Sequence, residues 1–407
     1  MKGASDPGPG ASTRAARSSE LIDDTASDPA SDPVSDVALA LTTLPSMGLA
    51  YLIQICREWP VTELVRALRE GSPIPHIGED KAAILPAVTV ERIERWRREL
   101  DTVDILALKR RYARADVTVL VRGASNYPER LRDDEFTSPV LFARGDLALL
   151  ERPGVAIVGT RSASRVGLAV ARRFGEELAY RGYAIVSGLA LGIDGAAHEG
   201  ALEKRSERAP GPIGVVASGL DVCYPRRHER LWAEVTGRGL MLSTSPLGMA
   251  PGAHLFPKRN RVIAGLGRIT LVVESHRRGG SLHTARAARE LGRRVLACPG
   301  ALDNPAGEGT NALLADGEAT LCRDINDVLL ALGQTPEPKS AADPRPEPSI
   351  DDALVLVALG WDPCTLDSAC ARSRQPMSRV VLSLARLESV GWVQRIDGRW
   401  QRIARLL

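Results

Sequence analysis

Three basic side chains stand close together in the segment Phe256–Leu266, which contains no acidic residue. Lys258, Arg259 and Arg261 fill three of four consecutive positions, and Asn260 fills the fourth. The apolar residues that follow predict a helix, so these cations lie near a helix N-terminus, where the macrodipole disfavours positive charge. A bound polyanion would offset that cost. The alternative is a group of three solvated charges.

Two turns of small residues each follow a short apolar run that predicts a buried strand. Gly159-Thr160-Arg161 follows Val155–Val158, and Ser187-Gly188 follows Tyr183–Val186. Ligands of a doubly wound sheet bind outside the carboxyl ends of its strands, so we expect the two turns to line one crevice. Arg161 favours phosphate as the ligand, because its planar fork can bind phosphate bidentately. The alternative is a turn glycine beside a solvated arginine, since the dinucleotide pattern G-x-G-x-x-G is absent.

A third loop, Gly279-Gly280-Ser281, opens an expected helix after the strand candidate Ile269–Glu274. Glycines at a helix start leave free backbone N–H groups that can bind an anion. The same residues fit a flexible loop in which Ser281 is the N-cap, and the two interpretations do not exclude each other. Gly280 and Ser281 therefore join the candidate phosphate-binding residues.

Candidate catalytic groups are few. Asp194 and His198 stand four residues apart at an expected helix start, which suits an acid–base pair. A capping role for Asp194 with a packed His198 explains the same spacing, and Glu274 fits either catalysis or the holding of a nearby arginine. The sequence has no metal-ligand spacing and no Ser-His-Asp order. We predict no catalytic residue, no metal site and no cofactor.

Strand and helix candidates alternate along the centre of the chain, which predicts an α/β fold with a doubly wound, mostly parallel sheet. The expected strands are Val117–Val121, Val140–Ala143, Val155–Val158, Tyr183–Val186, Ile213–Ala217, Leu240–Ser243, Ile269–Glu274 and Arg294–Cys298. The expected helices are Gly167–Arg181, Ala196–Lys204, His228–Thr236, Arg261–Leu266 and Ser281–Leu291.

Composition divides the rest of the chain. Residues 1–36 are rich in Ser, Asp and Pro and predict a disordered tail. Residues 37–115 predict a small helical module, whose Pro-x-x-Gly turn fits either a phosphate-binding helix-hairpin-helix or an ordinary helical hairpin. The central domain is expected over 116–333, and the proline-rich segment 334–349 is expected to be a linker. Residues 350–407 predict three helices and a hairpin turning at Asp397-Gly398, the order of a winged helix, which can bind DNA or protein.

Charge and cysteine content exclude few functions. The 407-residue chain has a formal charge of +3, so only a local cluster of charge can mark a nucleic-acid site. Aromatic residues make up 4%, which limits base stacking. The six cysteines contain no C-x-x-C pair and indicate reduced thiols. We expect a cytoplasmic protein with no membrane contact, because neither a signal peptide nor a spanning apolar run is apparent.

Several motifs between Gly123 and Ala319 together resemble the DNA-processing protein A (DprA/Smf) family, and they follow the family's order. They are Ser187–Asp194 with Ala197-His198, Gly219-Leu220-Asp221 with Tyr224-Pro225, and Phe256–Leu266, supported by Gly159-Thr160-Arg161, Val272-Val273-Glu274, Cys298-Pro299-Gly300 and Gly309-Thr310-Asn311.

The resemblance implies an extended Rossmann-like domain that binds single-stranded DNA and forms a homodimer. It also implies protection of incoming DNA during natural transformation and loading of the recombinase RecA, and family members are not known as enzymes. Carried over to this chain, the pocket for DNA phosphates would consist of Gly159, Thr160, Arg161, Ser187, Gly188, Lys258, Arg259, Asn260 and Arg261, with Gly280 and Ser281 beside it.

The chain departs from the family pattern at three places, while the basic motif is intact. Thr244 stands where a glutamate is usual, Gly279 where a serine is usual, and Glu318 where an alanine is usual. One competing hypothesis is a nucleotide-processing enzyme similar to the cytokinin-activating phosphoribohydrolases, although their Pro-Gly-Gly-x-Gly-Thr signature is missing. Another is a protein-interaction adaptor that acts through residues 350–407.

Overall fold

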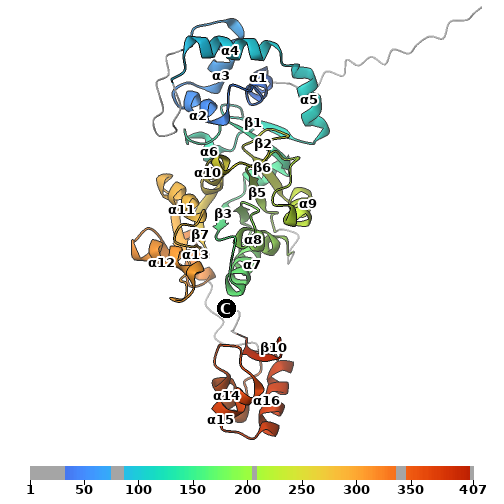
Figure 1. The fold of residues 1–407 in the computed structure, drawn as a ribbon, viewed down its shortest axis with the longest axis vertical. Helices are drawn as coiled ribbons and strands as arrows, with labels where there is room; N and C mark the ends of the chain where they lie inside the picture. The colour runs from blue at the N-terminus through green and yellow to red at the C-terminus, as the bar shows by residue number, and fades with distance from the viewer. Residues whose placement is uncertain (1–32, 75–86, 204–208, 336–344, 404–407) are drawn as a thin grey trace, which may run out of the picture. The chain divides into compact units, whose positions relative to one another are not determined.

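The computed structural model describes residues 33–74, 87–203, 209–335 and 345–403 (Figure 1). Its contacts divide the chain into two compact units, residues 1–127 with 139–141 and residues 128–138 with 142–407. Most of the expected tail and linker, at 1–32 and 336–344, lies outside the described residues, and the domain boundaries stay a prediction. In the described ranges no helix is long and apolar enough to cross a membrane.

The first unit is built mainly from helices, as the sequence predicts. Trp96 of the fourth helix is buried, as are Leu52 and Leu64 of the second and third. The turn after the first helix is held against the fourth helix. The Ser46 N–H and hydroxyl both donate hydrogen bonds to the Glu99 carboxylate. The elements are α1 (Pro33–Leu41), α2 (Leu49–Glu58), α3 (Val61–Glu70), α4 (Val90–Asp101), α5 (Ile105–Arg114) and β1 (Thr118–Val121).

A mostly parallel sheet forms the centre of the second unit and confirms the predicted fold class. Its strands in spatial order are β2 (Val140–Gly145), β6 (Leu240–Ser243), β5 (Ile213–Val216), β4 (Ala184–Ser187), β3 (Gly154–Val158), β7 (Gly267–Val272), β8 (Arg294–Ala297) and β9 (Thr320–Leu321). β2 and β6 pair antiparallel, and the other neighbours pair parallel.

The strand order reverses at β3, which lies between β4 and β7. The chain leaves β3 in one direction as far as β6 and then returns to the other side of β3. Such a reversal opens a crevice outside the carboxyl ends of the strands, which is where doubly wound folds bind ligands. The turns after β3, β4 and β7 therefore meet at one edge of the sheet, as the sequence analysis expected.

Helices cover the sheet. α7 (Arg165–Tyr180) and α8 (Ile193–Leu202) pack through Phe174 and Ala197 against strand residues such as Val155 and Ile185. The other helices are α6 (Glu129–Arg132), α9 (Glu229–Arg238), α10 (Phe256–Leu266), α11 (Ser281–Glu290), α12 (Glu308–Ala315) and α13 (Ile325–Ala331), with 3-10 turns at Leu147–Leu150, Arg226–His228, Ala253–Leu255 and Pro305–Gly307.

Helix α10 begins five residues before the predicted start at Arg261. Pro257 is tolerated in its first turn, because that position needs no intrahelical N–H bond. The earlier start places Lys258, Arg259 and Arg261 inside the helix. Helical rotation then decides which way each of them points.

The C-terminal module has the predicted order of three helices and a hairpin. Asp397 and Gly398 both have positive φ angles, 50° and 76°, as a type I′ turn requires. Val355, Val380 and Leu384 belong to a separate apolar core. The elements are α14 (Ile350–Leu359), α15 (Leu366–Ser373), α16 (Met377–Ser389), β10 (Val393–Ile396) and β11 (Arg399–Arg402).

Candidate nucleic-acid interface

The more polar of two adjoining pockets, with a volume of about 440 Å³, lies at the carboxyl ends of the strands that flank the switch point. It brings together seven of the eleven predicted phosphate-binding residues. These are Gly159, Thr160, Arg161, Arg259, Asn260, Gly280 and Ser281. A second, more apolar pocket adjoins the first, since both are lined by Arg161 and Arg259, and it adds Gly188.

Arg259 is the central cation of this site. The residue is 5% exposed, and its Nη1 lies 4.0 Å from Oδ2 of Asp194. Among the described residues no group accepts a hydrogen bond from its Nε. Burial lowers the pKa of Arg259, and the Asp194 carboxylate opposes that shift. A buried guanidinium without a closely paired carboxylate is a strong site for an anion.

The loop after β4 holds this arrangement. The Gly188 N–H donates to Oδ2 of Asp194 at 3.2 Å, and a Cβ atom at Gly188 would lie 1.7 Å from Nη1 of Arg259. The Ser187 hydroxyl donates to the Ile157 carbonyl at 2.6 Å, so it stabilises the strand ends instead of lining the pocket. Gly188 is thus required because the guanidinium occupies the space of a side chain.

The expected helix cap at Asp194 is wrong. α8 begins at Ile193 with Gly192 as its N-cap, and the Asp194 carboxylate points back to the loop after β4. Burial raises the pKa of Asp194, while Arg259 lowers it. His198 is fully buried, as the packing alternative expected, but neither ring nitrogen has a hydrogen-bond partner among the described residues.

Glu274 fixes the loop after β3. Its carboxylate accepts hydrogen bonds from the Ser164 N–H at 2.8 Å and from the Ser164 hydroxyl at 2.5 Å, and its carbonyl accepts from the Thr160 N–H. Ser164 in turn caps α7. The loop carries the exposed Arg161, whose guanidinium lies 5.1 Å from the Phe256 ring centre. Glu274 therefore holds the loop and not an arginine.

The start of α11 forms the opposite wall. Asn260 donates from Nδ2 to the Gly280 carbonyl at 3.3 Å, and Ser281 donates to the Ser275 hydroxyl at 2.9 Å. The expected N-cap at Ser281 is wrong, because Gly280 is the N-cap and provides no side chain. The first N–H groups of α11 lack a side-chain cap, and those of Leu282 and His283 donate to the Gly279 and Gly280 carbonyls at 3.1 and 3.2 Å.

Two aromatic rings border the adjoining pocket. Tyr224 and Phe256 lie with ring centres 6.2 Å apart, and the Phe256 ring also lies beside both pocket arginines. From the sequence, neither ring was expected to have a role beyond its place in the family motifs. Their position next to a basic run, in a chain with few aromatic residues, was the available signal. A flat ring can stack here while an attached anion contacts Arg161 or Arg259.

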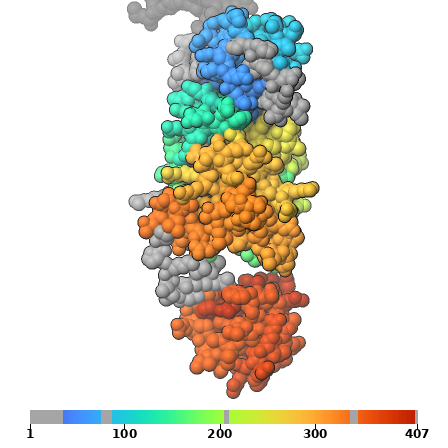
Figure 2. Space-filling model, turned by 90° about the vertical axis from the view of Figure 1, so that its left-hand side faces the viewer, coloured from blue at the N-terminus to red at the C-terminus, as the bar shows by residue number. Residues whose placement is uncertain are grey.

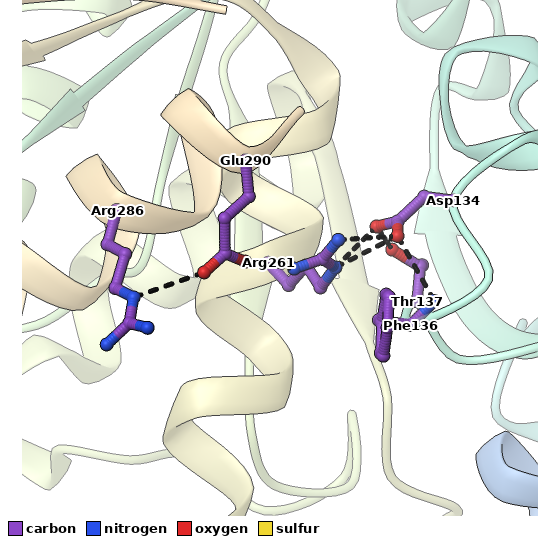
Figure 3. A network of polar contacts seen from close by, with 6 residues as sticks. All are labelled: Asp134, Phe136, Thr137, Arg261, Arg286 and Glu290. Atoms are coloured by element: carbon purple, nitrogen blue, oxygen red, sulfur yellow. Dashed lines mark hydrogen bonds and ion pairs between the residues drawn. The ribbon is translucent and has the colours of Figure 1, made fainter. Parts of the chain in front are cut away.

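Lys258 and Arg261 line neither of these two pockets. Burial lowers the pKa of Lys258 to about 8. Arg261 donates from Nε to Asp134 at 2.7 Å and from Nη1 to Glu290 at 2.8 Å, and its guanidinium lies 4.8 Å from the Phe136 ring centre (Figure 3). The structure thus separates these two predicted residues from Arg259.

A wider groove of about 900 Å³ lies between α11 and α12, on the face that the orange residues form in Figure 2. Its arginines are balanced by carboxylates. Arg286 pairs with Glu290 at 3.1 Å, and Arg289 pairs with Glu318 at 2.6 Å. This balance makes the groove a weaker anion site than the pocket at Arg259.

The chain is similar to known proteins in sequence and in fold. The family model for DNA recombination-mediator protein A matches residues 118–333. Protein Smf of Escherichia coli (strain K12) is 37% identical over 294 residues, covering 69% of this chain and 75% of Smf. The putative DNA processing protein DprA of Mycobacterium tuberculosis is 36% identical over 270 residues, covering 64% and 68%. The X-ray structure of DprA from Streptococcus pneumoniae superposes with a TM-score of 0.57 at 30% identity, covering 73% and 97%.

Proposed function

The chain belongs to the DNA recombination-mediator protein A family, and from this premise we propose that it binds single-stranded DNA in the pocket around Arg259. One observation carries the proposal. Arg259 is buried, points into the pocket and has no carboxylate nearer than 4.0 Å among the described residues. A DNA phosphate would pair with this guanidinium more closely than the Asp194 carboxylate does.

The adjoining pocket favours a single strand over a duplex. A phosphate between Arg161 and Arg259 would leave its nucleotide next to the rings of Tyr224 and Phe256. A base can stack there only when it is unpaired and turned away from a partner strand. We therefore assign the polar pocket to phosphates and the apolar pocket to a base.

Family membership supports the wider role. We propose that the protein protects incoming single strands during natural transformation, loads RecA onto them and acts as a homodimer in the cytoplasm. A readout of the loading step is RecA filament formation on DNA that is already covered by single-strand binding protein. Wild-type protein should accelerate filament formation, and a variant that cannot bind DNA should not.

The direct test compares the affinity of wild type and Arg259→Ala for single- and double-stranded oligonucleotides over a range of salt concentrations. Wild type should prefer the single strand. Arg259→Ala should bind it more weakly, with a log–log salt slope smaller by about 0.7, the value for one phosphate contact. Arg230→Ala is the matched control, because Arg230 is exposed and pairs with Glu234 in α9, away from the pocket residues. Unchanged affinity and slope in Arg259→Ala would refute the site.

We propose binding and not catalysis for this pocket. Among the residues that line the pocket, Asp194 carries the carboxylate. This carboxylate accepts a hydrogen bond from the Gly188 N–H and faces Arg259. A hydrolase of nucleoside monophosphates needs a carboxylate free to take or give a proton. Incubation with nucleoside monophosphates should release no free base, and release that Asp194→Asn abolishes would support the enzyme instead.

A further inference from the structure

We propose that the C-terminal module carries a second binding surface for single-stranded nucleic acid, separate from the pocket at Arg259. It is a row of alternating arginine and tryptophan side chains on the hairpin and on the loop after α14. The row consists of Arg395, Trp400, Arg402 and Trp361, and we call it the arginine–tryptophan row.

Strand pairing builds the row. Arg395 of β10 stands opposite Trp400 of β11, with its guanidinium 5.8 Å from the ring centre. Arg402 follows Trp400 by two residues and so points to the same face of the hairpin. Its guanidinium lies 4.5 Å from the ring centre of Trp361. The four side chains therefore alternate as cation, ring, cation and ring.

Backbone hydrogen bonds fix the loop that carries Trp361. The Cys364 N–H donates to the Trp400 carbonyl at 2.9 Å, and the Trp400 N–H donates to the Cys364 carbonyl at 2.8 Å. Cys364 thus pairs with Trp400 of β11, and Trp361, three residues earlier, is held beside the hairpin. The row is part of the folded module and not a chance contact of mobile side chains.

The row is open to a ligand at Trp361 and Arg395, whereas Trp400 is partly buried against the core of the module. Trp361 is 59% exposed although Arg402 covers part of its ring. Within the described part of the module, Arg395 and Arg402 form no ion pair, and Nε of Arg402 has no hydrogen-bond partner. By contrast, Arg386 in the same module is paired with Asp352 at 2.7 Å.

The chemistry of the row matches a single strand. Proteins that bind single-stranded nucleic acid combine rings on which bases stack with cations that contact the phosphates. Asp362 and Asp397 lie next to the row in sequence. Together with Arg395, Arg399 and Arg402 they leave an excess of one positive charge. Stacking would therefore contribute more than charge, so binding here should depend less on salt than binding at Arg259.

An apolar partner protein is the competing occupant. Leu354 and Val357 on α14 are 52% and 74% exposed. The sequence of α14 itself, however, contains no basic residue. The unpaired arginines occur on the hairpin, where they accompany the rings, and this arrangement favours nucleic acid.

The experiment uses the full chain and thymidine oligonucleotides that contain 5-bromodeoxyuridine, cross-linked by ultraviolet light and mapped to peptides. Cross-links should form at Trp361 or Trp400. Trp361→Ala should lose the cross-link at position 361. It should also weaken the binding of long oligonucleotides about five-fold or more, as expected for one lost stacking contact. Val357→Ala is the matched control, because Val357 is also exposed but lies outside the row, and this variant should bind normally.

The same experiment in the Arg259→Ala background separates the two sites. Cross-links at the row should persist there, whatever happens at the pocket. Cross-links confined to the pocket peptides would overturn the proposal. Equal losses of affinity in Val357→Ala and Trp361→Ala would also overturn it and would point to the apolar face of α14. If Trp361→Ala fails to fold, the exposed Arg395→Ala is the second variant, and normal cross-linking and affinity in it would also overturn the proposal.

Discussion

Arg261 donates hydrogen bonds from Nε and Nη2 to the Asp134 carboxylate, at 2.7 and 2.8 Å, although Arg261 lies only two residues from Arg259 (Figure 3). Two residues in an α-helix are rotated by about 200°, so neighbouring cations of one run point in opposite directions. Arg259 faces the pocket, and Arg261 joins α10 to the segment before β2. The side chain of Asp134 is only 3% exposed, so this is a largely buried ion pair.

Arg261→Ala should therefore affect stability and not the electrostatics of DNA binding. Removing the cation leaves Asp134 buried without its partner, which should lower the free energy of unfolding by about 3–5 kcal/mol. The salt slope for a single strand should stay at the wild-type value, in contrast to Arg259→Ala. Urea denaturation and binding titrations measure the two effects. Arg286→Ala, which loses only an exposed pair with Glu290, should change stability by less than about 1 kcal/mol. A slope reduced by Arg261→Ala would show that Arg261 contacts phosphate after all.

Gly188→Ala should weaken DNA binding although it substitutes no charged residue. The new methyl group would lie 1.7 Å from Nη1 of Arg259, so the guanidinium must leave its place. The obstacle is the end of a flexible side chain, so the fold should survive with a loss of about 1–3 kcal/mol. Gly280→Ala is the control at the same pocket, because no atom lies within 4 Å of its added Cβ and its N–H is retained. The affinity for single-stranded DNA should fall in Gly188→Ala as far as in Arg259→Ala. It should stay at the wild-type value in Gly280→Ala.

The sheet and its order of elements were predictable because buried parallel strands are short apolar runs with clear ends. Leu240–Ser243 was predicted to the residue. The small residues after β3 and β4 also indicated the crevice, since parallel strands present their carboxyl ends at one edge. The direction of each side chain on α10 was not predictable, because the helix begins earlier than its apolar pattern suggests.

Long-range partners were the other gap. Asp134 lies 127 residues from Arg261, and no local pattern links the two. Ser164 and Glu274 are likewise 110 residues apart. From the sequence, the role of Glu274 could therefore be either catalysis or the holding of an arginine. Ion pairs and hydrogen bonds of this kind depend on how the elements pack, and a single sequence shows only which residues are available.

His198 should make the protein less stable in mild acid. Burial lowers the pKa of its imidazole from 6.5 to about 3, so the folded state stays neutral where the unfolded chain takes up a proton. The free energy of unfolding should fall by about 1.4 kcal/mol per pH unit between about pH 6 and pH 4 from this group. Asp194 acts in the opposite sense, because its pKa is raised in the folded state. The test is therefore the difference between wild type and His198→Asn in urea denaturation at several pH values. Parallel curves for the two proteins would contradict the prediction.

Glu274→Gln should loosen the loop that presents Arg161 to DNA. The carboxylate accepts two hydrogen bonds from Ser164, one from the backbone and one from the hydroxyl, and the residue is 8% exposed. The glutamine amide keeps one acceptor oxygen but turns an N–H group toward one of the two Ser164 donors. A hydrogen bond to a charged group contributes about 1.5–3 kcal/mol to stability. Stability should fall by about that amount, and affinity for a single strand should fall with it, because Arg161 loses its fixed position. Glu234→Gln, which removes a charge from an exposed pair in α9, is the control and should change neither quantity by more than about 1 kcal/mol. If Glu274→Gln lowered stability but left affinity and salt slope at the wild-type values, Arg161 would not be a phosphate ligand, and Arg259 alone would carry the pocket.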